Sequence, residues 1–190
     1  MRRLKTQAIV LGSFVAVFWF VELVDWLVLK DALDAYGIKP RELDGLRGVL
    51  LAPFLHFGFR HVAANTVPFV FLGWLVGLRR ISDFFLVSAA IVLIGGLAVW
   101  LIGPAHSVHA GASGLVFGYL GFLLLRGYFE RSPVAILVAI VVGVVYASAL
   151  PGLLPGQSGV SWQGHLLSFA GGALAARVLS ARGRGVKLTV

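Results

Sequence analysis

The stretch GASGLVFGYLGFLLL, residues 111–125, decides how this sequence is interpreted. It opens with a serine among small residues, Gly111-Ala112-Ser113-Gly114, and continues as an apolar segment that predicts a helix over 112–125. Further along the chain a second polar residue, His165, opens another apolar segment. A hydroxyl and an imidazole on membrane-embedded helices are costly and usually mark function. The pair therefore indicates nucleophilic catalysis inside a bilayer.

The composition is that of a membrane protein. Of 190 residues, 59% are hydrophobic and 13% are charged, whereas about a quarter of a typical soluble domain is charged. A transmembrane helix needs roughly 20 apolar residues, and six segments are predicted to be such helices: 7–29, 61–78, 83–102, 112–125, 133–150 and 162–179. The first is too long for a cleaved signal peptide, so we expect it to be retained. The sequence thus predicts an all-α polytopic membrane protein with one domain over 1–190.

The positive charges predict the topology. Lys and Arg lie before the first helix, after the second, between the fourth and fifth, and after the sixth, whereas the loops at 103–111 and 151–161 have none. Basic residues favour the cytosolic side, so both termini are expected there, in a bacterial inner membrane. The net charge of +8 is not gathered on one soluble face, which argues against nucleic acid as a partner. Residues 30–60, of mixed charge, are expected to form a folded extracytoplasmic insertion.

This topology brings the unusual polar residues to one depth. The helices expected over 61–78, 112–125 and 162–179 all run from outside to inside. Each carries its polar residues at its start: His61 and Asn65, Ser113, and His165. We therefore expect these side chains to meet just below the outer surface.

Ser113 and His165 have the chemistry of a nucleophile and its general base. Glycines beside Ser113 permit close approach, and the free N–H groups of a helix start can stabilise an oxyanion. The alternative is packing, because Gly114 and Gly118 form a small-xxx-small pair and a histidine can be purely structural. The common depth of the two residues favours catalysis.

His61 and Asn65 lie four residues apart and so share one helical face. Both can donate hydrogen bonds to an oxyanion, although helix–helix hydrogen bonding would also explain them. No carboxylate lies on the three helices in question. Glu22 and Asp25 are expected to bind the 30–60 insertion instead, so the catalytic unit is predicted to be a Ser–His dyad.

The sequence lacks the residues that other catalytic mechanisms inside a membrane would need. The chain has no cysteine and no His-Glu-x-x-His motif, and no pair of aspartates is expected on facing helices, which excludes thiol catalysis, a zincin site and an aspartyl mechanism. His106 and His109 are spaced to touch a metal, but no carboxylate or thiol lies nearby. We expect them at the mouth of the site, and we expect no metal and no cofactor.

Three motifs, in order, resemble those of the rhomboid intramembrane serine proteases across 46–172. They are His56-x4-His61-x3-Asn65, Gly111-Ala112-Ser113-Gly114, and Gly164-His165 followed by Gly172. The resemblance implies a six-helix bundle with Ser113 as nucleophile and His165 as base. It also implies an oxyanion hole made by His61, Asn65 and the Ser113 N–H, with His56, Gly111 and Gly114 supporting the site.

The sequence departs from the family pattern in places. Phe117 stands where some members have tyrosine, so stacking on His165 is expected without a phenolic hydrogen bond.

The resemblance implies cleavage of transmembrane protein substrates near the outer membrane boundary. Two alternatives stay open: a non-proteolytic rhomboid-like protein that binds membrane clients, and a transporter or channel. The latter would need polar residues through the full depth of the bilayer.

Overall fold

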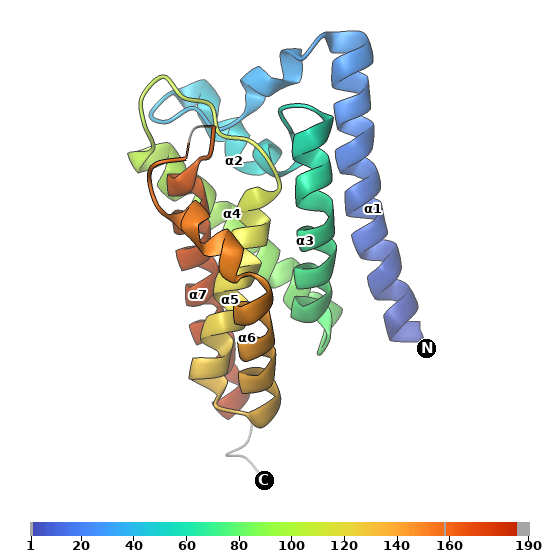
Figure 1. The fold of residues 1–190 in the computed structure, drawn as a ribbon, viewed down its shortest axis with the longest axis vertical. Coiled ribbons are helices and arrows are strands. Elements are labelled where there is room, and N and C mark those ends of the chain that lie inside the picture. The colour runs from blue at the N-terminus through green and yellow to red at the C-terminus, as the bar shows by residue number, and fades with distance from the viewer. Residues whose placement is uncertain (1, 158, 186–190) are drawn as a thin grey trace.

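The helix that begins at Ser113 lies at the centre of a helical bundle. The computed structural model describes residues 2–157 and 159–185. Its main helices are α1 (Arg2–Val24), α3 (Phe59–Gly77), α4 (Ile81–Ile102), α5 (Ser113–Glu130), α6 (Pro133–Val145) and α7 (Trp162–Gly185) (Figure 1). α5 contacts α3, α4, α6 and α7. Most side chains of its first ten residues are buried, which makes it the core around which the others pack.

Glycines allow α5 and α7 to pack backbone against backbone. A Cβ atom at Gly121 would overlap the carbonyl oxygen of Phe169, and one at Gly172 would overlap that of Gly118. Small residues at a helix interface permit this close approach in membranes. Ser168 of α7 lies against both Gly95 and Gly114, whose missing side chains leave room for its hydroxyl.

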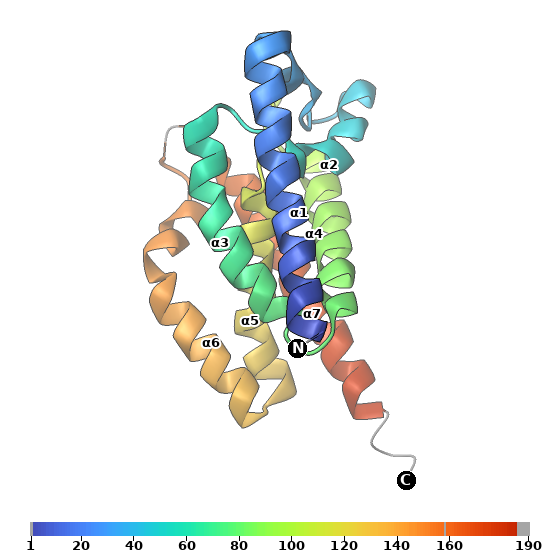
Figure 2. The same ribbon diagram turned by 90° about the vertical axis from the view of Figure 1, so that its right-hand side faces the viewer.

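Aromatic side chains fill the space between α1, α3, α4 and α5. The rings of Phe18, Phe69 and Phe84 are fully buried and pack with Phe14 and Tyr119. The Tyr119 hydroxyl lies 2.6 Å from Ser88 Oγ, so the buried phenol is satisfied within the bundle. α1 is thereby held against α3 and α4 (Figure 2).

The insertion between α1 and α3 folds into short helical turns at the upper end of the bundle in Figure 1. These are η1 (Asp25–Leu29), η2 (Ala32–Tyr36), η3 (Leu43–Arg47), α2 (Gly48–Leu51) and η4 (Ala52–Phe54). Asp25 Oδ1 accepts a hydrogen bond from the Leu33 N–H at 2.9 Å, as expected for that carboxylate. The Arg41 guanidinium donates to the carbonyls of Leu101 and Gly103, tying the insertion to the end of α4.

Several helices are apolar enough to cross a membrane, so the protein is a multi-pass membrane protein. Within the described residues three meet the requirements of length and hydropathy: Arg2–Leu29, α3 and α4. A fourth is added if α6 and η5 (Ala147–Leu153), which are bent by 77°, count as one span. α5 and α7 occupy the places predicted for spans, and the six-span count stays a prediction.

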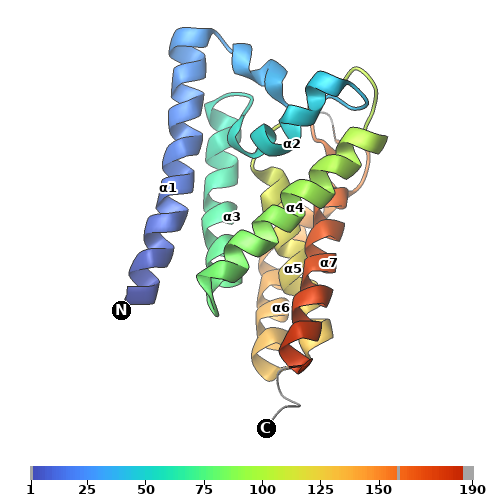
Figure 3. The same ribbon diagram turned by 180° about the vertical axis from the view of Figure 1, so that it is seen from behind.

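The three helices that carry polar residues near their N-termini run in the same direction. α3, α5 and α7 begin at the end of the bundle that holds the insertion, and α1 begins at the opposite end, where α7 finishes (Figures 1 and 3). The view from behind shows α4 crossing the bundle obliquely beside α7 (Figure 3). This arrangement gathers the beginnings of three helices under the insertion.

Candidate active site

The turn before α5 presents Ser113 at the first position of the helix. Gly111 has φ +117°, a conformation that side chains strongly disfavour. Its N–H donates to the Ala52 carbonyl at 2.8 Å, and a Cβ atom there would lie 2.6 Å from the ring of His61. Gly111 is therefore required both for the turn and for the approach of His61. The first N–H groups of a helix, here beginning with that of Ser113, have no intrahelical partner.

His165 lies within hydrogen-bonding distance of Ser113. Its Nε2 atom is 3.0 Å from Ser113 Oγ, and its Nδ1 atom is 3.0 Å from the Gly152 carbonyl oxygen. The ring of Phe117 stacks on the imidazole, with centroids 4.0 Å apart and planes inclined by 17°. The stacking expected from the sequence is thus present, and the imidazole is held on three sides.

A backbone carbonyl occupies the position where a triad would have a carboxylate. Because a carbonyl only accepts hydrogen bonds, His165 Nδ1 carries the proton and donates a hydrogen bond to the Gly152 carbonyl oxygen. Nε2 is then unprotonated and able to accept the Ser113 hydroxyl proton. Gly152, in η5, was not among the residues singled out from the sequence, since a carbonyl at any residue can play this part.

His61 and Asn65 lie four residues apart on one face of α3, and the ring of His61 lies against Gly111, close to Ser113. The Phe57 N–H donates to His61 Nδ1 at 3.2 Å, so the neutral ring has its proton on Nε2. A Cβ atom at Gly111 would lie 2.8 Å from that Nε2 and 3.6 Å from Ser113 Oγ. Asn65 Nδ2 donates to the His61 carbonyl at 3.0 Å and has a second N–H to offer. The Nε2–H group of His61 can therefore donate into the space beside Ser113, and Asn65 keeps a spare N–H group on the same face of α3.

His56 supports the start of α5 from behind. Its Nε2 accepts the Ala112 N–H at 3.2 Å, and its ring lies against Phe18 and His61. Burial lowers the pKa of His56 to about 3, and the nearby His61 acts in the same direction. A neutral ring is required, because a protonated Nε2 could not accept the Ala112 N–H.

His106 and His109, which were both expected at the mouth of the site, differ in solvent exposure. His106 is exposed, whereas His109 is buried. The ring of His109 lies 2.5 Å from Ser161 Oγ and 2.8 Å from Ser107 Oγ, and its backbone pairs with Ile38. His109 lines the cavity beside Ser113, in agreement with the expectation, although the loop folds inward onto the insertion and α7 and buries the ring. His106 does not line that cavity, so its place at the mouth of the site stays a prediction.

His109 holds the beginning of the helix that carries His165. Ser161 Oγ accepts the Gly164 N–H at 3.2 Å, and the Ser161 carbonyl accepts the His165 N–H at 3.0 Å. Burial lowers the pKa of His109, which favours the neutral ring. A serine at a helix start was the signal available in the sequence, because serine is a preferred N-terminal cap.

A cavity of about 60 Å³ adjoins Ser113 between α4, α5 and α7. It is lined by both polar and apolar groups, including Gly95, Val99, His109, Ser113, His165 and Ser168. A polar cavity of more than about 15 Å³ can hold a water molecule. There is thus room for water beside the hydroxyl of Ser113.

Comparison with known proteins identifies one family. A family model described as Rhomboid domain matches residues 44–182. An uncharacterized protein of Mycobacterium tuberculosis is 46% identical over 177 residues, which cover 89% of this chain and 73% of the relative. An uncharacterized protein of Mycobacterium leprae is 40% identical over 190 residues, 95% of this chain and 75% of the relative. Rhomboid protease GluP of Bacillus subtilis is 31% identical over 175 residues, 87% of this chain and 33% of the relative.

Proposed function

The chain belongs to the rhomboid family, and on that premise we propose that it is an intramembrane serine endopeptidase that uses Ser113 and His165. The single observation that carries the proposal is the bonding of His165: its Nε2 lies 3.0 Å from Ser113 Oγ while its Nδ1 is bonded to Gly152. A structural histidine needs only one such bond. Both together give the tautomer that a general base requires.

The reaction follows from these positions. Ser113 Oγ attacks the carbonyl carbon of the scissile peptide bond as its proton passes to His165 Nε2. The tetrahedral intermediate collapses, the C–N bond breaks, and His165 returns the proton to the leaving amine. Water then attacks the acyl-enzyme, giving up a proton to His165, and the carboxyl product leaves as Ser113 regains its hydrogen.

His61, Asn65 and the Ser113 N–H are the donors for the oxyanion. All three are on α3 or at the start of α5, where rigid elements hold them before substrate binds. Preorganised donors of this kind are typically worth about 3 kcal/mol each in the transition state. His56, Gly111 and Gly114 support this arrangement without touching the reacting atoms.

The substrates are transmembrane proteins cut near the outer boundary of the bilayer. The site lies at the end of the bundle that holds the 30–60 insertion. The other two loops at this end, 103–111 and 151–161, have no Lys or Arg, whereas the connections at the opposite end contain Arg79, Arg80 and Arg131. By the distribution of basic residues both termini face the cytosol of a bacterium, and the protein resides in its inner membrane. A substrate helix must unwind locally to expose a peptide bond, so small or helix-breaking residues near the cut favour cleavage.

A serine-reactive fluorophosphonate tests the proposal. Purified wild-type protein should be labelled, and Ser113→Ala should lose both the labelling and all cleavage of a transmembrane substrate. Asn65→Ala should keep partial labelling and cleave roughly a hundredfold more slowly, since one oxyanion donor is lost. Labelling that persists in Ser113→Ala defeats the proposal. Folded wild-type protein that neither reacts nor cleaves, yet still binds membrane clients, would establish the non-proteolytic alternative.

A further inference from the structure

A second cavity lies at the end of the bundle opposite Ser113. Its volume is about 410 Å³, and it is bounded by the end of α3, the end of α5, the start of α6 and the last turns of α7. Apolar side chains form most of its wall: Leu75, Leu78, Leu123, Val134, Ala135 and Val138. Its polar lining is Arg79, Arg126, Glu130, Ser132 and Ser180. The candidate active site shares none of these residues.

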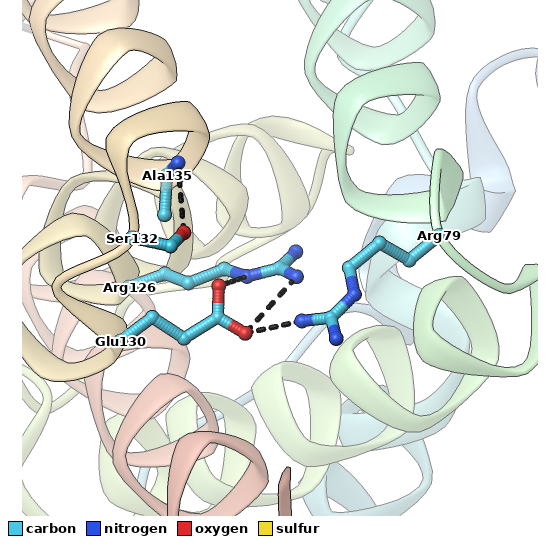
Figure 4. Close-up of polar contacts among 5 residues, drawn as sticks. All are labelled: Arg79, Arg126, Glu130, Ser132 and Ala135. Atoms are coloured by element: carbon cyan, nitrogen blue, oxygen red, sulfur yellow. Dashed lines mark hydrogen bonds and ion pairs between the residues drawn. The ribbon is translucent and has the colours of Figure 1, made fainter.

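Two arginines are held at this cavity by one carboxylate. Arg126 Nε donates to Glu130 Oε2 at 3.0 Å, and Arg79 pairs with Glu130 Oε1 from the connection after α3 (Figure 4). The three groups together bear one net positive charge. The Arg79 side chain is 62% exposed, and a guanidinium has five N–H donors, of which Glu130 takes one here. Donors and positive charge are therefore left over at the mouth.

Ser180 supplies a polar group deeper in the cavity. It is 4% exposed, and its Oγ atom has no hydrogen-bond partner among the described residues. A buried hydroxyl without a partner costs free energy. Ser132 Oγ, by contrast, already accepts the Ala135 N–H at 3.2 Å, as Figure 4 shows. The cavity thus offers one hydroxyl and spare guanidinium N–H groups to an incoming acceptor.

We propose that this cavity binds the phosphate of an anionic phospholipid from the leaflet at this end of the bundle. A phosphodiester oxygen accepts from Arg79, and a second phosphate or glycerol oxygen bonds Ser180 Oγ. The start of an acyl chain lies along Leu75, Val134 and Val138. The arginines favour an anion because guanidinium groups match phosphate geometry. The apolar wall, at the ends of membrane helices, favours a lipid over free phosphate.

The site is independent of the chemistry at Ser113. It adjoins the connection after α3, the end of α5 and the start of α6, so an occupying lipid bridges these elements, the first two of which are already paired through Arg79 and Glu130. The binding free energy of a ligand that prefers the folded state adds to its stability. Anionic lipid is therefore expected to stabilise the bundle at this end whether or not the protein cleaves anything.

Lipid binding to the full chain in an uncharged maltoside detergent tests this. Native mass spectrometry compares phosphatidylglycerol with phosphatidylcholine of the same acyl chains, and inorganic phosphate is added as a competitor. We expect phosphatidylglycerol to bind roughly tenfold more tightly than phosphatidylcholine, and Arg79→Gln to remove that preference, because it deletes a charge-assisted hydrogen bond. Ser180→Ala should weaken phosphatidylglycerol severalfold, because the hydroxyl that bonds a phosphate or glycerol oxygen is lost.

Arg131→Gln is the matched control. Arg131 lies at the same end of the bundle, over the ring of Tyr128, and does not line this cavity. Its substitution should change phosphatidylglycerol affinity less than twofold. Equal losses for Arg79→Gln and Arg131→Gln would overturn the proposal by showing diffuse attraction to a basic surface. Equal affinity for the two lipids would overturn it as well, and so would displacement of phosphatidylglycerol by inorganic phosphate at similar concentration.

Discussion

Toward α7, α5 packs backbone against backbone, whereas toward the outer half of α6 it packs through side chains. On the α7 side a Cβ atom at Gly172 would overlap a carbonyl oxygen of α5. On the α6 side a Cβ atom at Gly143 would lie 3.4 Å from the end of the Leu124 side chain, an ordinary contact. Beyond Val145 the chain bends by 77° into η5. The interface between α5 and α6 therefore ends where the candidate site begins.

The proposed active site is divided between these two regions. Ser113 and His165 lie on the closely packed pair, which fixes their separation. The carbonyl of Gly152, which bonds His165 Nδ1, belongs to η5 after the bend. Movement of α6 and η5 could therefore admit substrate and change the orientation of the imidazole without separating the two helices that carry the reacting atoms. Substitutions at the α5–α7 interface should therefore have different effects from substitutions at the α5–α6 interface.

The largest effect is expected for Gly172→Ala. Its methyl group cannot fit without parting α5 from α7, so the free energy of unfolding should fall by about 3 kcal/mol. Fluorophosphonate labelling of Ser113 should be lost as the two helices separate. Gly143→Ala adds the same methyl group toward α6 and should change stability by less than about 0.5 kcal/mol.

Unfolding in mixed micelles with sodium dodecyl sulfate, followed by circular dichroism, measures both variants. Gly143→Ala is the matched control, because both substitutions replace a helical glycine with a residue of higher helix propensity. Equal destabilisation by the two would contradict the distinction between the two interfaces.

A crosslink between α3 and the end of α6 should reduce cleavage roughly tenfold, because a segment that must move is then held. The ring centroids of Phe71 in α3 and Tyr146 at the end of α6 lie 6.2 Å apart. Since the chain has no cysteine, Phe71→Cys with Tyr146→Cys gives a unique pair for a short bismaleimide. Cleavage of a transmembrane substrate should fall while labelling by the small fluorophosphonate persists.

The double variant without crosslinker controls for the two substitutions. Full cleavage by the crosslinked protein would show that α6 does not have to move away from α3. Loss of labelling together with cleavage would mean that the crosslink distorts the site itself, which contradicts the separation between the two regions.

The sequence predicted the closely packed region well, because that region depends on residue types at fixed spacing. The serine at the start of α5, the histidine near the start of α7 and the glycines between them are visible as motifs, and the structure places Ser113 and His165 in contact. The stacking of Phe117 on His165 was expected from the resemblance to the family, and it is present. Such short-range patterns specify which side chains share a face.

The sequence predicted less where backbone atoms or distant loops matter. The Gly152 carbonyl could not be foreseen, since every residue has a carbonyl and only the bend after α6 directs this one at His165. Burial of His109 depends on its pairing with Ile38 in the insertion, a contact between residues far apart in the chain. The predicted end of the fourth helix at 125 was too early, because Arg126 and Glu130 continue α5 as an ion pair one helical turn apart.

Loss of the His109 ring should have a moderate effect, because it acts through α7 and not on substrate. We expect His109→Ala to lower kcat roughly fivefold with little change in KM, since the start of α7 loses the group that fixes Ser161. His109→Gln, which can still donate and accept, should recover most of the rate. His106→Ala, on the exposed histidine of the same loop, is the control, and a loss as large as that of His109→Ala would refute this role.

The smallest effect concerns pH and the histidine behind α5. Because burial lowers the pKa of His56 to about 3, from about 6.5 in the unfolded chain, its contribution to stability is complete above pH 6.5 and declines as pH falls toward 3. The loss between pH 6.5 and 5.5 should be about 1 kcal/mol. His56→Gln, whose amide oxygen can accept the Ala112 N–H, should flatten this part of the pH profile of unfolding. An unchanged slope would show that the pKa of His56 is the same in the folded and the unfolded chain, which contradicts the lowering by burial behind α5.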